Sequence, residues 1–204
     1  RTPTPDWETV LDLDALNEAE GENWVWHGVE TLRPEHPRVL IDLSRGGADA
    51  DVTREFDLDT LSFVEDGFFR PESKGTLTWR DADSVFLVSA LGPDTVNRAG
   101  YARTARVWHR GTPMSEAEIV FEGPADNVGY GIHALRDHTP GFERDLLLHY
   151  LDNRDSDLYL GDGHGGYTRL DAPASAIARV HREWLTLELR DPWTLGDVTH
   201  PAGS

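Results

Sequence analysis

The chain has 204 residues, a length that fits one large domain or two small ones, and 38% of its residues are hydrophobic. Its 37 acidic residues outnumber its 19 basic residues, which gives a formal net charge of −18 that repels phosphate backbones and anionic membrane surfaces. Nucleic acid and membranes are therefore not expected as partners, and the lack of cysteine excludes disulfides, thiolate metal sites and a cysteine nucleophile.

The predicted location is the cytoplasm. No stretch reaches the roughly 18 apolar residues of a membrane span, and the N-terminal sequence RTPTPDWETV lacks the apolar core of a signal peptide. Because residue 1 is Arg rather than an initiator Met, a targeting segment removed from before it stays compatible with the sequence.

Short strands dominate the predicted secondary structure. Helical periodicity is confined to residues 14–19 and 115–117, whereas short alternating or apolar runs between Gly, Pro, Asp and Asn are typical of an all-β protein. In chain order these runs predict strands at 7–14, 23–30, 38–44, 52–58, 61–66, 75–81, 83–90, 104–111, 117–123, 127–135, 145–151, 157–163, 167–172, 175–181 and 183–189.

The order of these strands contains a repeat. Corresponding runs begin near Val52, Ala105 and Asp157, at an interval of about 50 to 55 residues. A four-strand unit of this length fits the blades of a β-propeller, whereas a sandwich predicts no fixed four-strand period. We therefore predict an all-β fold, a partial β-propeller of four-stranded antiparallel blades, in a single domain over residues 1–204.

The repeat also gives the blade boundaries. Three full blades are predicted at about residues 23–66, 74–122 and 127–171, with a leading strand at 7–14 and a trailing hairpin at 175–190. Because blades bury their faces against neighbours, the first and last of them are expected to leave unpaired faces that favour self-association. An unrelated all-β domain with a chance period is the alternative.

The stretch DLSRGGADADVTREFDLD, residues 42–59, joins two of these strands. Gly46 and Gly47 permit positive φ, and Asp49 or Asp51 can bond the backbone of a turn. We therefore interpret it as the turn between the second and third strands of the first blade.

The patterns that would indicate catalysis or metal binding are incomplete. No serine lies in Gly-x-Ser-x-Gly, and Ser44 is interpreted as a turn residue. His133 and His138 match no zinc template, and His164 lies in GDGHGG, a glycine-rich turn between strands rather than a phosphate cradle. The acidic run at 152–157 lacks the glycine and final glutamate of an EF-hand. We predict no catalytic residue, no metal and no cofactor.

One long connection is a candidate contact loop. LGPDTVNRAGYARTARVWHRGTP, residues 91–113, carries Asn97, Arg98, Tyr101 and Arg103. Long loops in compact folds are often functional, and exposed Tyr and Arg are good contact residues. The alternative is that Tyr101 packs on the blade and the arginines pair with carboxylates.

Four stretches carry a family resemblance. They are DWETVLDLDALNEAEGENWVWHG, LSRGGADADVTREFDLDTLSFVEDGFF, AGYARTARVWHRGTP and RDHTPGFERD. Together they resemble the N-terminal β-propeller of bacterial prolyl oligopeptidase family serine peptidases, in the same order and over almost the whole chain. One departure is Ala102 in GYART, where the family pattern has Pro, so the fixed φ of proline is lost there.

The resemblance implies a role within a two-domain enzyme. Family members carry a seven-bladed propeller and a C-terminal α/β-hydrolase domain, which supplies the Ser, Asp and His of the triad and cleaves short peptides, typically after proline. The propeller covers the active site and restricts access. None of the matching positions is catalytic, so the chain itself is expected to be an inactive gating and scaffold portion, with that hydrolase domain and the peptide substrate as its partners.

Two other functions stay open from the sequence. One is a stand-alone propeller-type module that binds a peptide or protein through residues 91–113. The other is a metal- or carboxylate-dependent hydrolase such as a propeller glycosidase, which needs inward-facing pairs of acids near the propeller axis.

Overall fold

The chain forms two compact units. A computed structural model describes residues 6–32 and 36–204. The first unit spans residues 1–73 and the second spans 74–204, where the sequence predicted a single domain. In the described part of the chain, every pairing between strands joins strands of the same unit.

Short strands make up most of both units. The first unit contains the helix α1 (Leu13–Glu20) and the strands β1 (Trp24–Thr31), β2 (Arg38–Arg45), β3 (Asp51–Asp57), β4 (Ser62–Phe63) and β5 (Phe69–Ser73). The second unit contains β6 (Gly75–Asp81), β7 (Ser84–Ser89), β8 (Thr104–His109), β9 (Glu118–Glu122), β10 (Gly131–Asp137), β11 (Arg144–Tyr150), β12 (Ser156–Gly161), β13 (Tyr167–Arg169), β14 (Ile177–His181), β15 (Trp184–Glu188), β16 (Trp193–Leu195) and β17 (Val198–His200). It also contains two short 3-10 helices, η1 (Pro93–Thr95) and η2 (Met114–Glu116). Among the described residues no helix is long and apolar enough to cross a membrane.

The prediction of a leading strand at residues 7–14 is wrong. Residues 7–12 form no strand, and α1 begins at Leu13. The Asp12 side chain caps the helix by accepting hydrogen bonds from the backbone N–H groups of Asp14 at 3.0 Å and Ala15 at 3.1 Å. Leu13 and Leu16 then pack on the apolar core of the first sheet, and the helix contains residues 14–19, where the sequence showed helical periodicity.

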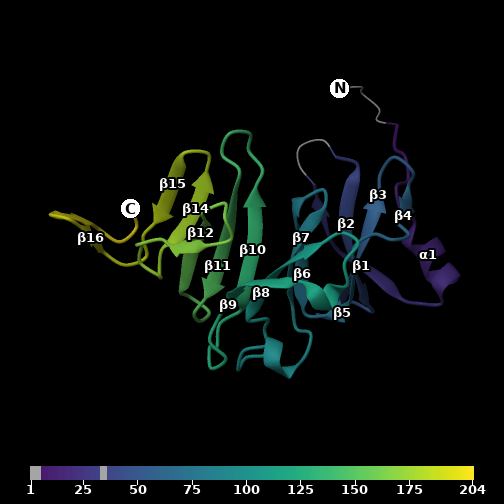
Figure 1. Cartoon of the computed structure of the whole chain (residues 1–204), viewed down its shortest axis with the longest axis horizontal. Coiled ribbons are helices and arrows are strands. Elements are labelled where there is room, and N and C mark those ends of the chain that lie inside the picture. The colour runs from purple at the N-terminus through teal and green to yellow at the C-terminus, as the bar shows by residue number, and fades with distance from the viewer. Residues whose placement is uncertain (1–5, 33–35) are drawn as a thin grey trace. The chain divides into compact units, whose positions relative to one another are not determined.

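The first sheet contains a strand that the sequence analysis missed. Strands β1, β2, β3 and β4 follow one another in antiparallel order, and β5 also pairs with β3 (Figure 1). Phe63 of β4 lies opposite Phe56, and Phe69 of β5 lies opposite Arg54, so both strands occupy the same edge of β3. The sequence FRPES does not read as a strand because Pro71 interrupts it, but proline is tolerated at a sheet edge.

Two four-stranded antiparallel sheets follow in the second unit. They are formed in chain order by β6–β9 and β10–β13 (Figure 1). The third strands of the three sheets begin at Asp51, Thr104 and Ser156, which keeps the predicted period. Beyond them, β14 and β15 pair as a hairpin within residues 175–190, and β16 and β17 form a further hairpin that was not predicted.

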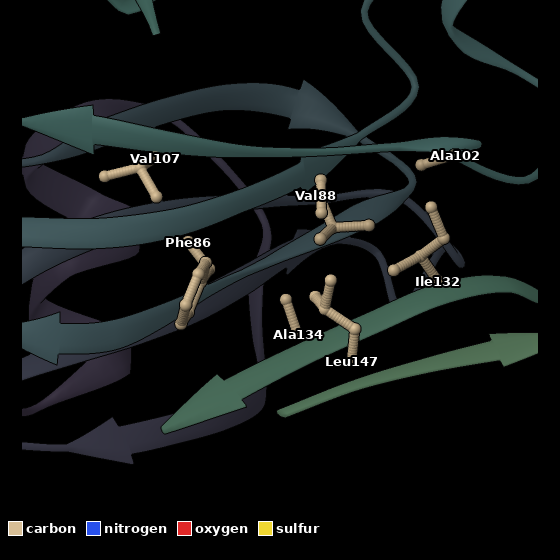
Figure 2. Packing of buried hydrophobic residues seen from close by; sticks show 8 residues of the cluster. Phe86, Val88, Ala102, Val107, Ile132, Ala134 and Leu147 are labelled. Atoms are coloured by element: carbon tan, nitrogen blue, oxygen red, sulfur yellow. The ribbon is translucent and has the colours of Figure 1, made fainter. Parts of the chain in front are cut away.

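The second and third sheets share an apolar core. Figure 2 shows Phe86 and Val88 of β7 beside Ala134 of β10 and Leu147 of β11. A polar contact joins the same two sheets, because the Thr78 hydroxyl donates to the carbonyl of Ala134 at 2.7 Å. Burial of one sheet face against the next is the packing expected of neighbouring propeller blades.

Candidate functional site

The predicted contact loop joins β7 to β8. Its later residues form β8 itself, and its irregular part contains η1 and an isolated antiparallel bridge between Val96 and Ala102. The backbone N–H of Asn97 donates to the carbonyl of Tyr101 at 2.8 Å, and that of Gly100 donates to the carbonyl of Asn97 at 2.9 Å. The tip of the loop is therefore a closed, hydrogen-bonded turn.

Asn97 holds this turn in place. Its side chain is only 5% exposed. Oδ1 accepts hydrogen bonds from the backbone N–H groups of Ala99 and Tyr101, both at 3.0 Å, and Nδ2 donates to the carbonyl of Gly129 at 2.8 Å. One buried amide thus ties the β7–β8 loop to the segment that leads into β10.

Replacing Asn97 by alanine is expected to destabilise the second unit by about 2–3 kcal/mol, because two backbone N–H groups and one carbonyl lose their buried partner. Urea unfolding measures this loss. The matched control is Asn153→Ala, which removes an exposed amide and should change stability by less than about 0.5 kcal/mol. We call the hydrogen bonds of the Asn97 side chain to Ala99, Tyr101 and Gly129 the Asn97 clamp. Equal stability of the native chain and the Asn97 variant would show that this clamp does not stabilise the loop.

A row of tyrosine rings lies beside the clamp. Tyr101 packs edge to face on Tyr130, with 5.4 Å between ring centroids, and Tyr130 packs in the same way on Tyr150 at 6.3 Å. Tyr101 is half-buried, whereas Tyr130 is 54% exposed. We call Tyr101, Tyr130 and Tyr150 the tyrosine row; it presents aromatic surface from the loop, from the segment before β10 and from the end of β11.

The two arginines of the loop differ. Arg103 braces the loop, because its guanidinium pairs with the carboxylate of Glu122 and donates to the carbonyls of Gly123 at 3.0 Å and Asp94 at 3.1 Å. The side chain of Arg98 is exposed, and only its backbone N–H is held, by the carbonyl of Asn127 at 3.1 Å.

The four predicted contact residues therefore come together in one loop but play different parts. Asn97 is buried and Arg103 is ion-paired, as the alternative interpretation held for the arginines. Tyr101 packs on another ring and keeps part of its surface open. Arg98 alone among the four presents an exposed side chain.

Sequence reasoning missed the partners of this loop. Asn127 lies with its Nδ2 3.2 Å from Nε2 of His149, whose imidazole is buried against the ring of Phe121. Burial lowers the pKa of His149, which favours the neutral imidazole. These contacts connect residues far apart in the chain, so no local sequence motif predicts them.

One local signal for the missed segment did exist. The sequence NVGYGI places Tyr130 between two glycines. Gly131 has φ 83°, and a Cβ there would collide with the carbonyl of Ala102. Such a position accepts glycine alone, so the second glycine marks the close approach of β10 to the loop.

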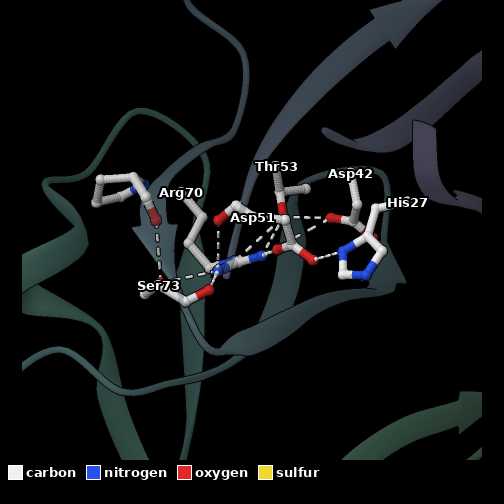
Figure 3. A network of polar contacts seen from close by, with 7 residues as sticks. His27, Asp42, Asp51, Thr53, Arg70 and Ser73 are labelled. Carbon is white, nitrogen blue, oxygen red and sulfur yellow. Dashed lines mark hydrogen bonds and ion pairs between the residues drawn. The ribbon is translucent and has the colours of Figure 1, made fainter. Parts of the chain in front are cut away.

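A polar network lies in the first unit. Arg70 is fully buried, and its guanidinium pairs with the carboxylate of Asp51 and donates to the Thr53 hydroxyl at 2.8 Å (Figure 3). It also donates to the carbonyl of Ser73 at 2.9 Å and to the Ser73 hydroxyl at 2.7 Å. Arg70 thus fastens the end of β5 to β3.

Two further groups complete this network. His27 sits at a bulge of β1 with Nδ1 2.5 Å from Oδ2 of Asp51. The Thr53 hydroxyl donates to Asp42 at 2.5 Å, so both carboxylates have partners (Figure 3). The role of the network is therefore to hold strands β1, β2, β3 and β5 together.

This network corrects the interpretation of the turn at residues 42–59. Gly46 and Gly47 do form the turn between β2 and β3, with φ of 62° and 79°. Asp51, however, belongs to β3 and binds Arg70 rather than the turn backbone. Ser44, interpreted as a turn residue, is fully buried within β2, because that strand pairs with β1 as far as Arg45.

Asp42 and Asp57 should have opposite effects on how stability changes with pH. Burial raises the pKa of Asp42 above 3.8, so its charged form costs stability as pH rises through the raised pKa. Backbone hydrogen bonds from Thr60 and Asp59 lower the pKa of Asp57, so its charged form adds stability that is lost as pH falls. In urea unfolding at about pH 2.5 to 7, Asp42→Asn should gain stability relative to the native chain as pH rises above 3.8, and Asp57→Asn should lose stability relative to it as pH rises toward 3.8. Parallel curves for both variants would contradict the assignment.

The other candidate residues lie in structural positions. His133 is in β10, and burial lowers its pKa. His138 has Nε2 3.3 Å from the carbonyl of Trp79, and exposed His164 lies in a turn where its N–H donates to Asp162 at 2.7 Å. In residues 6–32 and 36–204 no group of three or more His, Asp or Glu side chains is arranged to hold a metal ion.

Comparison with known protein families agrees with a propeller of four-stranded antiparallel sheets. Residues 2–159 match the family described as prolyl oligopeptidase, N-terminal beta-propeller domain. The chain is 36% identical to an uncharacterized peptidase of Sinorhizobium fredii over 206 residues, which cover 98% of this chain and 28% of that protein. It is 30% identical to an uncharacterized peptidase of Rickettsia prowazekii over 212 residues, which cover 98% of this chain and 29% of that protein.

A solved structure has the same fold. A post-proline cleaving enzyme from Rickettsia typhi superposes with a TM-score of 0.88 at 23% sequence identity, over 98% of this chain and 31% of that enzyme. The chain thus spans less than a third of the length of each of these relatives.

Proposed function

Because this chain belongs to the prolyl oligopeptidase N-terminal β-propeller family, we propose that it is the substrate-access and interdomain scaffold portion of a serine endopeptidase that cleaves short peptides after proline. The chain is a partial β-propeller of antiparallel sheets. In this proposal it is inactive alone, and the triad belongs to a C-terminal α/β-hydrolase domain of the parent protein, in the cytoplasm.

One observation carries the proposal. The match covers residues 2–159 of this chain, whereas the chain covers only 28% and 29% of two relatives that are named as peptidases. A propeller portion that accompanies a much longer polypeptide is suited to control access to a site that the rest of the polypeptide provides.

The reading frame tests this proposal. It should continue beyond Ser204 into a segment with Gly-x-Ser-x-Gly on a strand-to-helix turn, followed by the Asp and His of a hydrolase triad. A reading frame that stops at Ser204, or that continues into a different domain, would contradict the proposal.

A second function is favoured by the Asn97 clamp. A stand-alone module that binds a peptide or protein through residues 91–113 would need a loop already held in its binding conformation, because preorganisation lowers the entropic cost of binding. The hydrogen bonds of Asn97 to Ala99, Tyr101 and Gly129 supply such a restraint. Peptide binding without any hydrolase segment in the reading frame would favour this function.

Self-association of the 204-residue chain is a further part of the proposal. Trp184 of β15 and Val198 of β17 are 64% and 57% exposed, and apolar surface of this kind favours association. Sedimentation velocity should give faster species as the concentration rises, and Trp184→Glu should reduce them. A single monomer boundary at all concentrations would contradict self-association.

A further inference from the structure

Arg98 is exceptional among the arginines of this protein. In residues 6–32 and 36–204 every other arginine side chain has a hydrogen bond, an ion pair or an aromatic ring as its partner. The exposed guanidinium of Arg98 has none of these among the described residues. In a chain with a formal net charge of −18, where acids are abundant, an arginine side chain without any hydrogen bond, ion pair or ring contact is unexpected.

The position of Arg98 is fixed although its side chain is free. The turn that carries it is closed by hydrogen bonds between Asn97 and Tyr101, and its own N–H donates to the carbonyl of Asn127 at 3.1 Å. The guanidinium therefore projects from a rigid backbone, and little backbone entropy is lost when a ligand binds it.

Exposed apolar residues follow the residue that binds the backbone of Arg98. Asn127, which holds the backbone of Arg98, is followed by Val128 and Tyr130, which are 55% and 54% exposed. Tyr130 is backed by the rings of Tyr101 and Tyr150, so its position is set by packing. Rigid aromatic side chains beside an arginine are the composition typical of binding hot spots.

The chemistry selects an anionic ligand with an apolar neighbour. A guanidinium forms a forked, charge-assisted pair with a carboxylate, and tyrosine faces pack against apolar side chains and proline rings. A peptide that ends in an apolar residue carries both groups on the α-carbon of its last residue. The exposed carboxylate of Asp126 next to Asn127 opposes a highly charged anion, which favours a ligand with a single carboxylate.

We propose that Arg98, Val128 and the tyrosine row form a binding ledge for the C-terminal end of a short peptide. The free α-carboxylate pairs with Arg98, and the terminal apolar residue packs on Tyr130. The ledge rests on the proposed function, because it gives the propeller portion a direct contact with peptides that carry a free C-terminus.

Two matched peptides test the ledge. The probes are acetyl-Gly-Phe-Pro with a free C-terminal carboxylate and the same peptide with a C-terminal amide, titrated into the 204-residue chain by calorimetry. The carboxylate form should bind about tenfold more tightly, because a hydrogen bond to a charged group is stronger than one to a neutral group. Arg98→Gln should abolish this difference, and Tyr130→Ala should weaken both peptides.

The control is Arg154→Gln, which removes an exposed arginine that is paired with Asp191 and should leave both affinities unchanged. Equal affinities of the two peptides for the native chain, a carboxylate preference that survives in Arg98→Gln, or no binding to a chain with native circular dichroism would overturn the ledge. These outcomes are independent of the reading-frame test, so the ledge and the proposed function can fail separately.

Discussion

Replacing Arg70 by methionine is expected to destabilise the first unit by about 3–5 kcal/mol, because loss of one partner leaves a buried carboxylate without its counter-charge. The carboxylate is that of Asp51, and the Thr53 hydroxyl and Ser73 carbonyl lose a donor at the same time. Methionine fills a similar volume, so the loss reports polar contacts rather than a cavity. Urea unfolding measures the change, and amide hydrogen exchange of β3 and β5 places it in the first unit.

Two variants control this experiment. Arg45→Met removes an arginine whose pairs with Glu22 and Glu72 are partly exposed, and exposed pairs contribute about 1 kcal/mol or less. Arg70→Lys keeps the charge but loses the forked donors, so its stability should lie between those of the native chain and Arg70→Met. A loss in Arg70→Met no larger than in Arg45→Met would show that the network does not hold the sheet together.

Replacing Phe86 by alanine is expected to destabilise the second unit by about 3–5 kcal/mol, the cost of removing a buried aromatic ring and leaving a cavity. Phe86 is fully buried and belongs to the apolar cluster that also contains Ala134 of the next sheet. Its loss should therefore weaken the packing between the second and third sheets, which thermal unfolding and hydrogen exchange of β7 and β10 both detect.

The control is Phe69→Ala, which makes the same substitution at a position that is 53% exposed and so separates the effect of burial from that of losing a phenyl ring. It should cost about 1 kcal/mol or less. Hydrogen exchange that accelerates in β7 but stays unchanged in β10 after the Phe86 substitution would contradict a core shared by the two sheets.

The repeat of strands could be read from the sequence because it depends on local patterns. Alternating apolar residues and turn residues predict each strand, and the interval between third strands is visible without knowledge of any contact. The all-β fold class and the resemblance to the family's propeller are accordingly confirmed. The prediction of a strand at residues 7–14 was wrong because the apolar alternation there competes with a helix cap at Asp12. The effect of that cap depends on the packing of Leu13 and Leu16.

The candidate site could be predicted only in part. Local composition indicated the loop with Arg98 and Tyr101. Which residues of that loop are buried, paired or exposed, however, depends on contacts with residues distant in sequence. Asn97 binds Gly129, 32 residues away, and Arg70 binds Asp51, 19 residues away. Short-range sequence patterns do not indicate such pairs, so the Asn97 clamp and the buried network around Arg70 are visible only in the structure.

Peptide hydrolysis would show whether catalysis requires the part of the protein that follows residue 204. The 204-residue chain and the product of its complete reading frame would be assayed side by side on a Gly-Pro anilide, each purified to constant specific activity. We expect turnover by the complete product, loss of that turnover when the serine of its Gly-x-Ser-x-Gly segment is replaced by alanine, and no turnover by the 204-residue chain. Turnover by the 204-residue chain alone would contradict a propeller portion whose catalytic residues lie elsewhere.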